Sequence, residues 1–283
     1  MSITKWWCGA HQAEVPLDHF KHCTHVHPDF VAAILADREL QAERAGVRVS
    51  SASACPRKYA ILATEDVAVD PLSFLQAMKG TAWHKVMEVG AELTDNPAGD
   101  TAVLKDDVLG AEISVAGEIA GIQLTGTIDR VLLRDSKLVG QDHKTGKDAR
   151  EVFIRGGKSY GKVIKGQGAP IEYKIQLSIY AELYRQQTGN AWDSAEIWWT
   201  LLNHWCEPIE IISVDECLAH HPYDSEFTVG EILTQAQQVA EGAVKWEDLP
   251  LVGKTFKFGP KFTGCDYCEV RDKCWIQAQG APF

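Results

Sequence analysis

The 283-residue sequence contains no run of about 18 consecutive apolar residues, the length that a membrane-spanning helix needs. Its N-terminus also lacks a charged segment followed by an apolar run and a cleavage site, the pattern of a secretion signal. The hydrophobic content of 45% is enough for a packed core, so global disorder is not expected. We therefore expect a globular, soluble, cytoplasmic protein that does not contact membranes.

Positive charge is also scarce, because 28 Lys and Arg stand against 39 Asp and Glu, a net charge of −11. This balance argues against a protein that coats nucleic acid non-specifically. The segment from Lys144 to Lys165 reverses the sign, with seven basic residues against Asp148 and Glu151. We expect this segment to contact DNA phosphates, and the alternative is a solvated Gly-rich loop with incidental charge. The candidate DNA-binding residues are Lys147, Arg150, Arg155 and Lys158.

The periodicity of apolar residues predicts an α/β fold with a central mixed sheet flanked by helices. Five helices are expected, over about 29–45, after a cap at Ser53, over 71–93, from Pro170 to 188, and over 229–244. Five strands are expected over 112–116, 123–133, 137–144, 195–202 and 208–214. We divide the chain into a Cys/His-rich appendage over residues 1–28 and a main domain over residues 29–283.

Two short motifs place acidic residues on neighbouring predicted strands. In Gln141-Asp142-His143-Lys144 the side chains alternate across the sheet, so Asp142 and Lys144 project to one face and His143 to the other. Asp129, in Gly126-Thr127-Ile128-Asp129, lies on the preceding strand, which a hairpin brings alongside. Two carboxylates beside an ammonium group suit Mg²⁺, a hard ion that takes oxygen ligands.

Two predicted helices carry polar pairs four residues apart, which share a helix face. These pairs are His84 and Glu88, and Gln176 and Tyr180. Each pair alone is a weak signal, because a lone helical histidine is more often structural. The motifs G-x-x-x-H, G-x-x-D, D-x-K and Q-x-x-x-Y occur here in one order, which resembles the motif series of RecB-like nucleases of the PD-(D/E)XK superfamily.

This resemblance implies a restriction-endonuclease-like core and a deoxyribonuclease that uses Mg²⁺ or Mn²⁺ to hydrolyse phosphodiester bonds. It implies an exonuclease or end-processing enzyme on DNA that is single-stranded or has free ends, with a helicase or recombination protein as a possible partner. The implied metal ligands are His84, Asp129, Asp142 and the carbonyl of His143, and Lys144 is the implied catalytic lysine. Gln176 and Tyr180 would support the site or contact the DNA backbone, and Glu88 is a weaker candidate.

The eight cysteines, without a secretion signal, favour a metal framework over disulfides. Cys265, Cys268 and Cys274 are closely spaced near the C-terminus, and Cys55 is the candidate fourth thiolate. One cysteine before the core and three after it resemble the iron–sulfur branch of the RecB-like nucleases. The resemblance implies a structural [4Fe–4S] cluster that clamps the N- and C-terminal parts together, and Zn²⁺ at the same thiolates stays open. Cys206 and Cys217 are expected to be ordinary half-buried thiols.

Residues 1–28 carry a third candidate metal site. Cys8-Gly-Ala-His11 and Cys23-Thr-His25-Val-His27 give two pairs of sulfur and nitrogen ligands, spaced like those of a small zinc site. The expected ligands are Cys8, His11, Cys23 and His25, with His27 as the other choice for the fourth position. His19 and His22 blur this choice, and a His-rich loop without metal is the alternative.

Two functions compete with the nuclease. One is a non-catalytic DNA-binding or assembly module of recombination or replication that keeps the fold and the cluster, and the other is a zinc-stabilised accessory factor. The joint presence of Asp129, Asp142 and Lys144 argues against the first, because a site without a reaction has no chemical need for that grouping. The second, whose residual site would bind metal only, stays open. Several tryptophans offer stacking platforms for bases, although core packing is the more common fate of this residue: Trp192, Trp198, Trp199 and Trp205.

Overall fold

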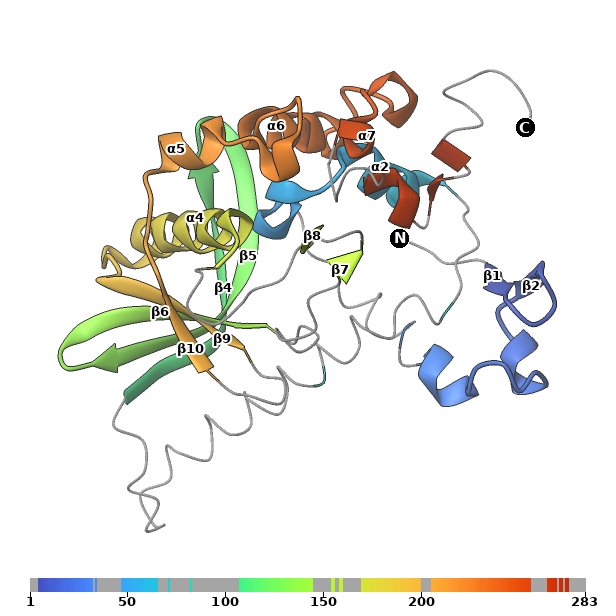
Figure 1. Cartoon of the computed structure of the whole chain (residues 1–283), viewed down its shortest axis with the longest axis horizontal. Coiled ribbons are helices and arrows are strands. Elements are labelled where there is room, and N and C mark those ends of the chain that lie inside the picture. Colours follow the sequence, from blue (N-terminus) through green and yellow to red (C-terminus); the bar gives the residue numbers. More distant parts are fainter. Residues whose placement is uncertain are drawn as a thin grey trace, which may run out of the picture.

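The computed structural model describes residues 5–32, 34, 47–65, 71, 82, 107–144, 154–155, 158–159, 169–199, 205–255, 264–268, 270–271 and 273–274. A six-stranded mixed sheet lies on one side of this part of the chain (Figure 1). Its strands are β3 (Val47–Arg48), β4 (Asp107–Ile119), β5 (Ile122–Arg134), β6 (Lys137–Lys144), β9 (Ser194–Trp199) and β10 (Trp205–Ile209). The order is β10-β9-β6-β5-β3, and β4 also pairs with β5.

Strands β4, β5 and β6 form an antiparallel meander with two tight turns. Ala120 and Gly121 form the first turn and Asp135 and Ser136 the second, all with positive φ, as two-residue hairpins require. Arg130 of β5 pairs with Gln141 of β6. One further step along this antiparallel register brings the acid of β5 next to the acid of β6.

Helix α4 (Ile171–Thr188) connects β6 to β9, which run parallel to each other. Parallel neighbours need such a crossover, and α4 packs across one face of the sheet (Figure 1). Pro170 caps the start of the helix, and Gly189 ends it in the left-handed conformation (φ 80°). The arrangement holds the first turns of α4 over the end of β6, where the two predicted catalytic motifs meet.

The main hydrophobic core lies between this sheet and its helices. Ile175, Ile179 and Leu183 of α4 belong to one buried cluster with Ile128 of β5 and Ile197 of β9. Helices α5 (Val214–Ala219) and α6 (Val229–Ala240) add to the same core, and each begins with a reciprocal Ser/Thr–Glu capping box. The sequence prediction of a central mixed sheet flanked by helices is confirmed.

A second hydrophobic core joins the two ends of the described chain. It takes side chains from β1 (Lys5–Cys8), β2 (Ala13–Pro16), the 3-10 turns η1 (His19–Lys21) and η5 (Trp246–Asp248), and α2 (Pro56–Thr64). Trp6 and Phe20 belong to the same cluster as Ile61, Trp246 and Cys274. N-terminal residues therefore share a core with the C-terminal cysteine segment, and the division at residue 28 stays a prediction.

The observed elements differ from the predicted ones mainly at their ends. Ser53 does not cap a helix, since it ends the 3-10 turn η2 (Val49–Ser53), and Cys55 is the N-cap of α2. Pro56 explains the shift, because a residue without N–H and with a fixed φ suits the first helical position. The strand expected over 208–214 is β10 at 205–209, and Ser213 is already the N-cap of α5. Most of the helix expected over 71–93 lies outside the described residues.

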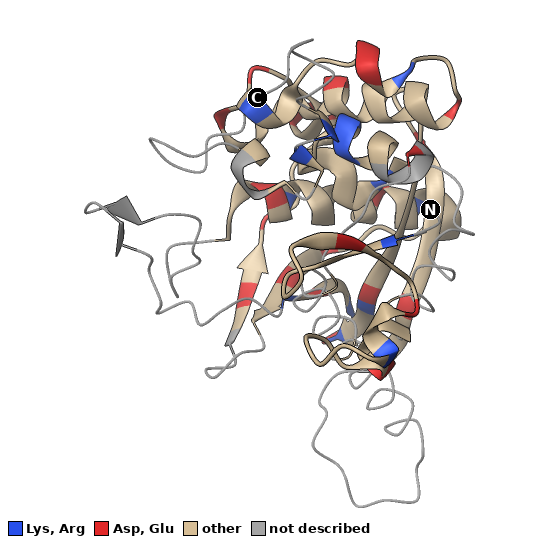
Figure 2. Cartoon of the chain, turned by 90° about the vertical axis from the view of Figure 1, so that its right-hand side faces the viewer, with Lys and Arg blue, Asp and Glu red and all other residues tan. Residues whose placement is uncertain are grey.

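The described helices and strands carry charged residues of both signs, as the composition leads one to expect. Lys and Arg alternate with Asp and Glu over helices and strands rather than gathering on one of them (Figure 2). Within the described ranges, none of the helices combines the length and the apolar character that crossing a membrane would require.

Candidate functional site

Asp142 and Lys144 lie together at the end of β6, as their spacing predicts. Lys144 Nζ lies 2.7 Å from Asp142 Oδ2, and both side chains are largely buried. The pKa of Lys144 is raised: burial lowers it, but the charge and hydrogen bond of Asp142 raise it by more. The same Asp142 oxygen is buried, and because a carboxylate oxygen has two lone pairs, it can bind a cation beside the Lys144 ammonium group.

Asp129 reaches the same place from β5. Its Oδ2 accepts a hydrogen bond of 2.6 Å from the backbone N–H of His143, and the side chain is only 9% exposed. This bond holds Asp129 against the peptide unit that joins Asp142 to His143. The structure therefore brings Asp129, Asp142, Lys144 and the backbone of His143 together.

Helix α4 supplies the polar residues that cover this site. Gln176 Oε1 accepts a hydrogen bond from Lys144 Nζ (3.3 Å), and Gln176 Nε2 donates to the hydroxyl of Tyr180 (3.5 Å). Lys144 also lies over the ring of Tyr173, 4.9 Å from its centre, which adds a cation–π contact. Burial raises the pKa of Tyr180, so its hydroxyl stays protonated and can donate. Tyr173 is a site residue that sequence reasoning missed; its place three positions before Gln176, one turn of α4, is the signal that identifies it.

The opposite face of β6 carries a buried polar chain that sequence reasoning also missed. Gln141 Oε1 is paired with His143 Nε2 (2.8 Å), and Gln141 Nε2 donates to Glu196 Oε1 (2.6 Å). Arg134 holds the same carboxylate with bonds of 2.9 and 3.1 Å. Since buried polar groups are costly unless paired, this chain restrains the twist and register of β6. Glu196, an acid within the largely apolar strand β9, is the sequence signal that could have revealed this polar chain.

The donor set suits a divalent oxygen-binding cation. Asp129 and Asp142 are buried acids on neighbouring strands, and Lys144 is the cation paired with Asp142. Carboxylates and carbonyls with few protein ligands are typical of Mg²⁺ sites. The fourth predicted ligand, His84, lies outside the described residues, as does Glu88.

Gly126 of the G-x-x-D motif has a packing role under the site. A methyl group at this position would overlap the ring of Tyr180. We expect Gly126→Ala to cost about 1–3 kcal/mol of unfolding free energy and to lower the cleavage rate, because Tyr180 and Gln176 must move. Urea unfolding and initial rates measure both effects.

Gly117→Ala is the matched control on the neighbouring strand, also beneath α4. There the added methyl meets the end of the flexible Gln186 side chain and Leu183 Cδ2 at 3.0 Å. Equal losses of stability and activity in the two variants would contradict the role given to Gly126.

Four cysteines from the two ends of the chain line one cavity of about 230 Å³. They are Cys55, the N-cap of α2, and Cys265, Cys268 and Cys274. All four are free thiols, and Lys58 and Arg271 line the same cavity. Burial raises the pKa of Cys274, while Arg57 and Lys254 act in the opposite direction. The thiol-lined cavity with basic neighbours suits a soft-metal centre of negative charge.

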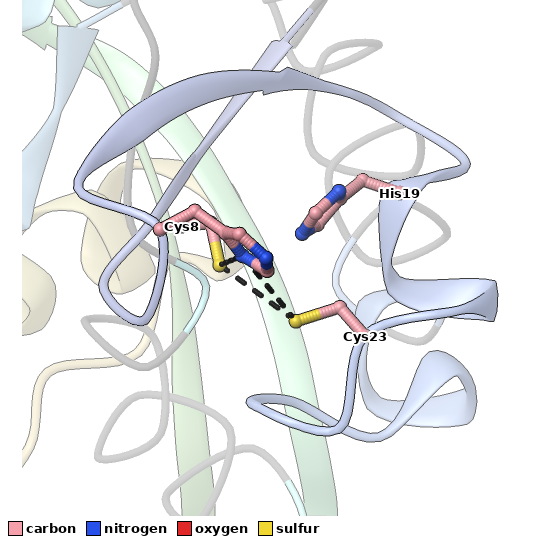
Figure 3. A group of neighbouring side chains, drawn as sticks. Cys8, His19 and Cys23 are labelled. Carbon is pink, nitrogen blue, oxygen red and sulfur yellow. Dashed lines mark hydrogen bonds between the residues drawn. The ribbon is translucent and has the colours of Figure 1, made fainter.

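A second group of ligands lies in the N-terminal segment. The candidate ligand atoms of Cys8, His11, His19 and Cys23 all lie within 4.8 Å of one another. Three of these are the expected ligands, but His19 takes the fourth place rather than His25 or His27, since η1 turns its ring inward (Figure 3). His27 is exposed and faces Asp29. Burial raises the pKa of Cys8, but contacts with His11 lower it by more, to about 6.

The structure describes part of the predicted DNA-binding segment. Arg155 and Lys158 are backbone partners in the antiparallel pair of β7 (Ile154–Arg155) and β8 (Lys158–Ser159), whereas Lys147 and Arg150 lie outside the described residues. Two of the four tryptophans pack in the main core rather than serving as stacking platforms, Trp192 and Trp199. Of the two remaining cysteines, Cys206 is exposed and Cys217 is buried, so neither is half-buried.

Residues 99–275 match the PD-(D/E)XK nuclease superfamily, and this range includes the G-x-x-D and D-x-K motifs. No curated protein sequence matches the chain. Among solved structures, SSO0001 is similar over 86% of this chain and 96% of its own, with 14% identity and a TM-score of 0.43. A predicted exonuclease from Eubacterium rectale is similar over 48% of this chain and 46% of its own, with 16% identity and a TM-score of 0.32.

These structural similarities are distant, so the assignment depends on the family match, which covers more than half of the sequence. The described geometry is consistent with it, since both motifs converge on one buried site at the end of β6. The chain belongs to the PD-(D/E)XK nuclease superfamily.

Proposed function

We propose that this protein is a metal-dependent deoxyribonuclease that removes nucleotides from DNA ends. The observation that carries the proposal is the buried group of Asp129, Asp142 and Lys144, held by adjacent strands and covered by α4. A purely structural role would not need two buried carboxylates gathered beside one ammonium group. Membership of a nuclease superfamily supports the same reaction class.

The residues of the site have distinct roles in this proposal. Asp129, Asp142 and the carbonyl of His143 would hold Mg²⁺ or Mn²⁺, which supplies an activated water and neutralises charge on the phosphate. Lys144 places a positive charge beside Asp142, where it can stabilise the negative charge that develops on the phosphate oxygens. Gln176 and Tyr180 position the Lys144 ammonium from α4. The chemistry is attack of water on a phosphodiester bond.

The four cysteines around the 230 Å³ cavity form the second part of the proposal, a structural [4Fe–4S] cluster. In a tetrahedral zinc site with Zn–S bonds of about 2.3 Å, the sulfurs lie about 3.8 Å apart. Among the described residues, the ligand atoms that gather within 4.8 Å of one another belong to Cys8, His11, His19 and Cys23. The four cysteines of the cavity do not form such a compact group. The wide cavity and its basic lining favour a cluster over a single zinc ion.

Digestion of linear and closed DNA tests the function. We expect the purified protein with Mg²⁺ or Mn²⁺ to release short products from linear single-stranded DNA and from duplexes with frayed ends, and excess EDTA to stop the reaction. Covalently closed single-stranded circles of the same sequence should resist, because they offer no end. Labels at the 5′ and 3′ ends, read on sequencing gels, would reveal the direction.

The outcomes separate the competing functions. Cutting of closed circles at the rate of linear DNA would contradict the requirement for ends and indicate an endonuclease. Binding of DNA without cleavage under either metal would overturn the enzyme and favour the non-catalytic module. DNA that lacks the 5′-phosphate or carries a blocked 3′ end serves as the control for end recognition.

A further inference from the structure

We propose that Cys8, His11, His19 and Cys23 bind a structural Zn²⁺ ion. This site is separate from the proposed nuclease centre and from the four-cysteine cavity, and it does not depend on either. Its ligands come from the end of β1, the β1–β2 turn, η1 and the loop after η1. Figure 3 shows the thiols of Cys8 and Cys23 and the ring of His19 directed at a common point.

The distances within the group fit a tetrahedral zinc centre. With bonds of about 2.3 Å to sulfur and 2.0–2.1 Å to nitrogen, two sulfurs lie about 3.8 Å apart, and a sulfur lies about 3.6 Å from a nitrogen. The two sulfurs of Cys8 and Cys23 are 3.8 Å apart. His11 Nδ1 lies 3.2 Å from the sulfur of Cys8 and 3.8 Å from that of Cys23, on either side of the expected value.

The fourth ligand, His19, is identified by its distance to the other three ligands, and a buried nitrogen supports the choice. His19 Nε2 is buried, and the described side chains offer it no well-oriented hydrogen-bond partner. A buried polar atom of this kind is costly unless something binds it, and zinc commonly binds neutral imidazole. The His19 and His11 rings stand nearly perpendicular (87°), with centres 4.9 Å apart, so both can direct a nitrogen to one ion.

A disulfide between the two cysteines does not explain the group. The sulfurs are 3.8 Å apart, whereas a disulfide bond measures about 2.05 Å. A disulfide would also leave two imidazole nitrogens gathered beside it without a function. Two thiolates and two imidazoles are a common zinc ligand set, and four protein ligands leave no position open for a substrate. The site is therefore structural rather than catalytic.

The ion would hold the β1–β2 hairpin to η1 and thereby organise the second core. Cys8 itself belongs to that core, together with Trp6 and Phe20 from the same segment. These side chains pack in one cluster with Val270 and Cys274 of the C-terminal segment. Loss of zinc should therefore loosen the N-terminal segment first and expose apolar surface beside the four-cysteine cavity.

Metal analysis of the purified full-length chain tests the proposal. We expect about one zinc per chain by mass spectrometry of metals, with an X-ray absorption spectrum of two sulfur and two nitrogen neighbours. His11→Gln, His19→Gln and Cys23→Ser should each lose most of this zinc. His25→Gln and His27→Gln are the matched controls and should keep it, because these histidines are not in the group.

These measurements test the zinc site directly and need no assay of DNA cleavage. A folded wild-type chain without zinc, or with zinc bound by four sulfurs, would overturn the proposal; the second result would place the ion in the four-cysteine cavity. Loss of zinc from His25→Gln but not from His19→Gln would overturn the choice of ligand. If a variant fails to fold, the wild-type stoichiometry and absorption spectrum still decide.

Discussion

Replacing Asp142 with asparagine should lower the rate of DNA cleavage by roughly three orders of magnitude. The substitution keeps the shape of the side chain but removes a charge worth several kcal/mol to a bound divalent ion and its transition state. It also removes the 2.7 Å ion pair that positions Lys144. Initial rates on end-labelled linear DNA with Mg²⁺ measure the effect, and circular dichroism checks the fold.

Lys144→Ala should give a loss of about two to three orders of magnitude, comparable with removal of one preorganised charge or donor at other catalytic centres. Two exposed residues near the β5–β6 turn provide controls, Asp135→Asn and Lys137→Ala, which change the same charges outside the site. Asparagine also tolerates the positive φ of Asp135. If Asp142→Asn and Lys144→Ala cleaved as fast as these controls, the proposed catalytic assignment would be wrong.

The second large effect concerns the four-cysteine cavity. Protein purified without oxygen should be brown, with broad absorbance near ~400 nm from iron–thiolate bonds, and Cys268→Ala should lose this colour. It should also lose about 5 kcal/mol of unfolding free energy on the loop-entropy estimate, because the cluster closes a loop of about two hundred residues. Iron and sulfide analysis and denaturant unfolding measure the two effects.

Cys206→Ala is the matched control, because Cys206 is exposed on β10 and takes no part in the cavity. It should keep both the colour and the stability. A colourless wild-type protein that contains zinc with four sulfur neighbours would contradict the cluster and favour the zinc alternative. The unfolding free energy lost in Cys268→Ala would then measure the contribution of that zinc ion to stability.

The proposed catalytic group could be predicted from the sequence because local rules place its members. Alternation along a strand puts Asp142 and Lys144 on one face, and a two-residue turn aligns β5 with β6. The i, i+4 spacing of Gln176 and Tyr180 puts both on one side of α4. These rules need only a few consecutive residues, so they hold before any tertiary contact is known.

Other features depend on contacts between distant residues. The partnership of Gln141 with Glu196 follows from the parallel register of β6 and β9, which are joined through a whole helix. The choice of His19 over His25 depends on the direction in which η1 turns the chain after β2. Several histidines lie within reach of one ion in that short segment, so spacing alone did not single one out.

The wide separation of the four cysteines along the chain affects how the protein matures. Cys55 is synthesised about two hundred residues before its three companions, Cys265, Cys268 and Cys274. A centre that needs all four can therefore be inserted only after every strand of the described sheet has been synthesised. The ligands of the N-terminal group are complete by Cys23, so that group can be loaded while the ribosome is still working.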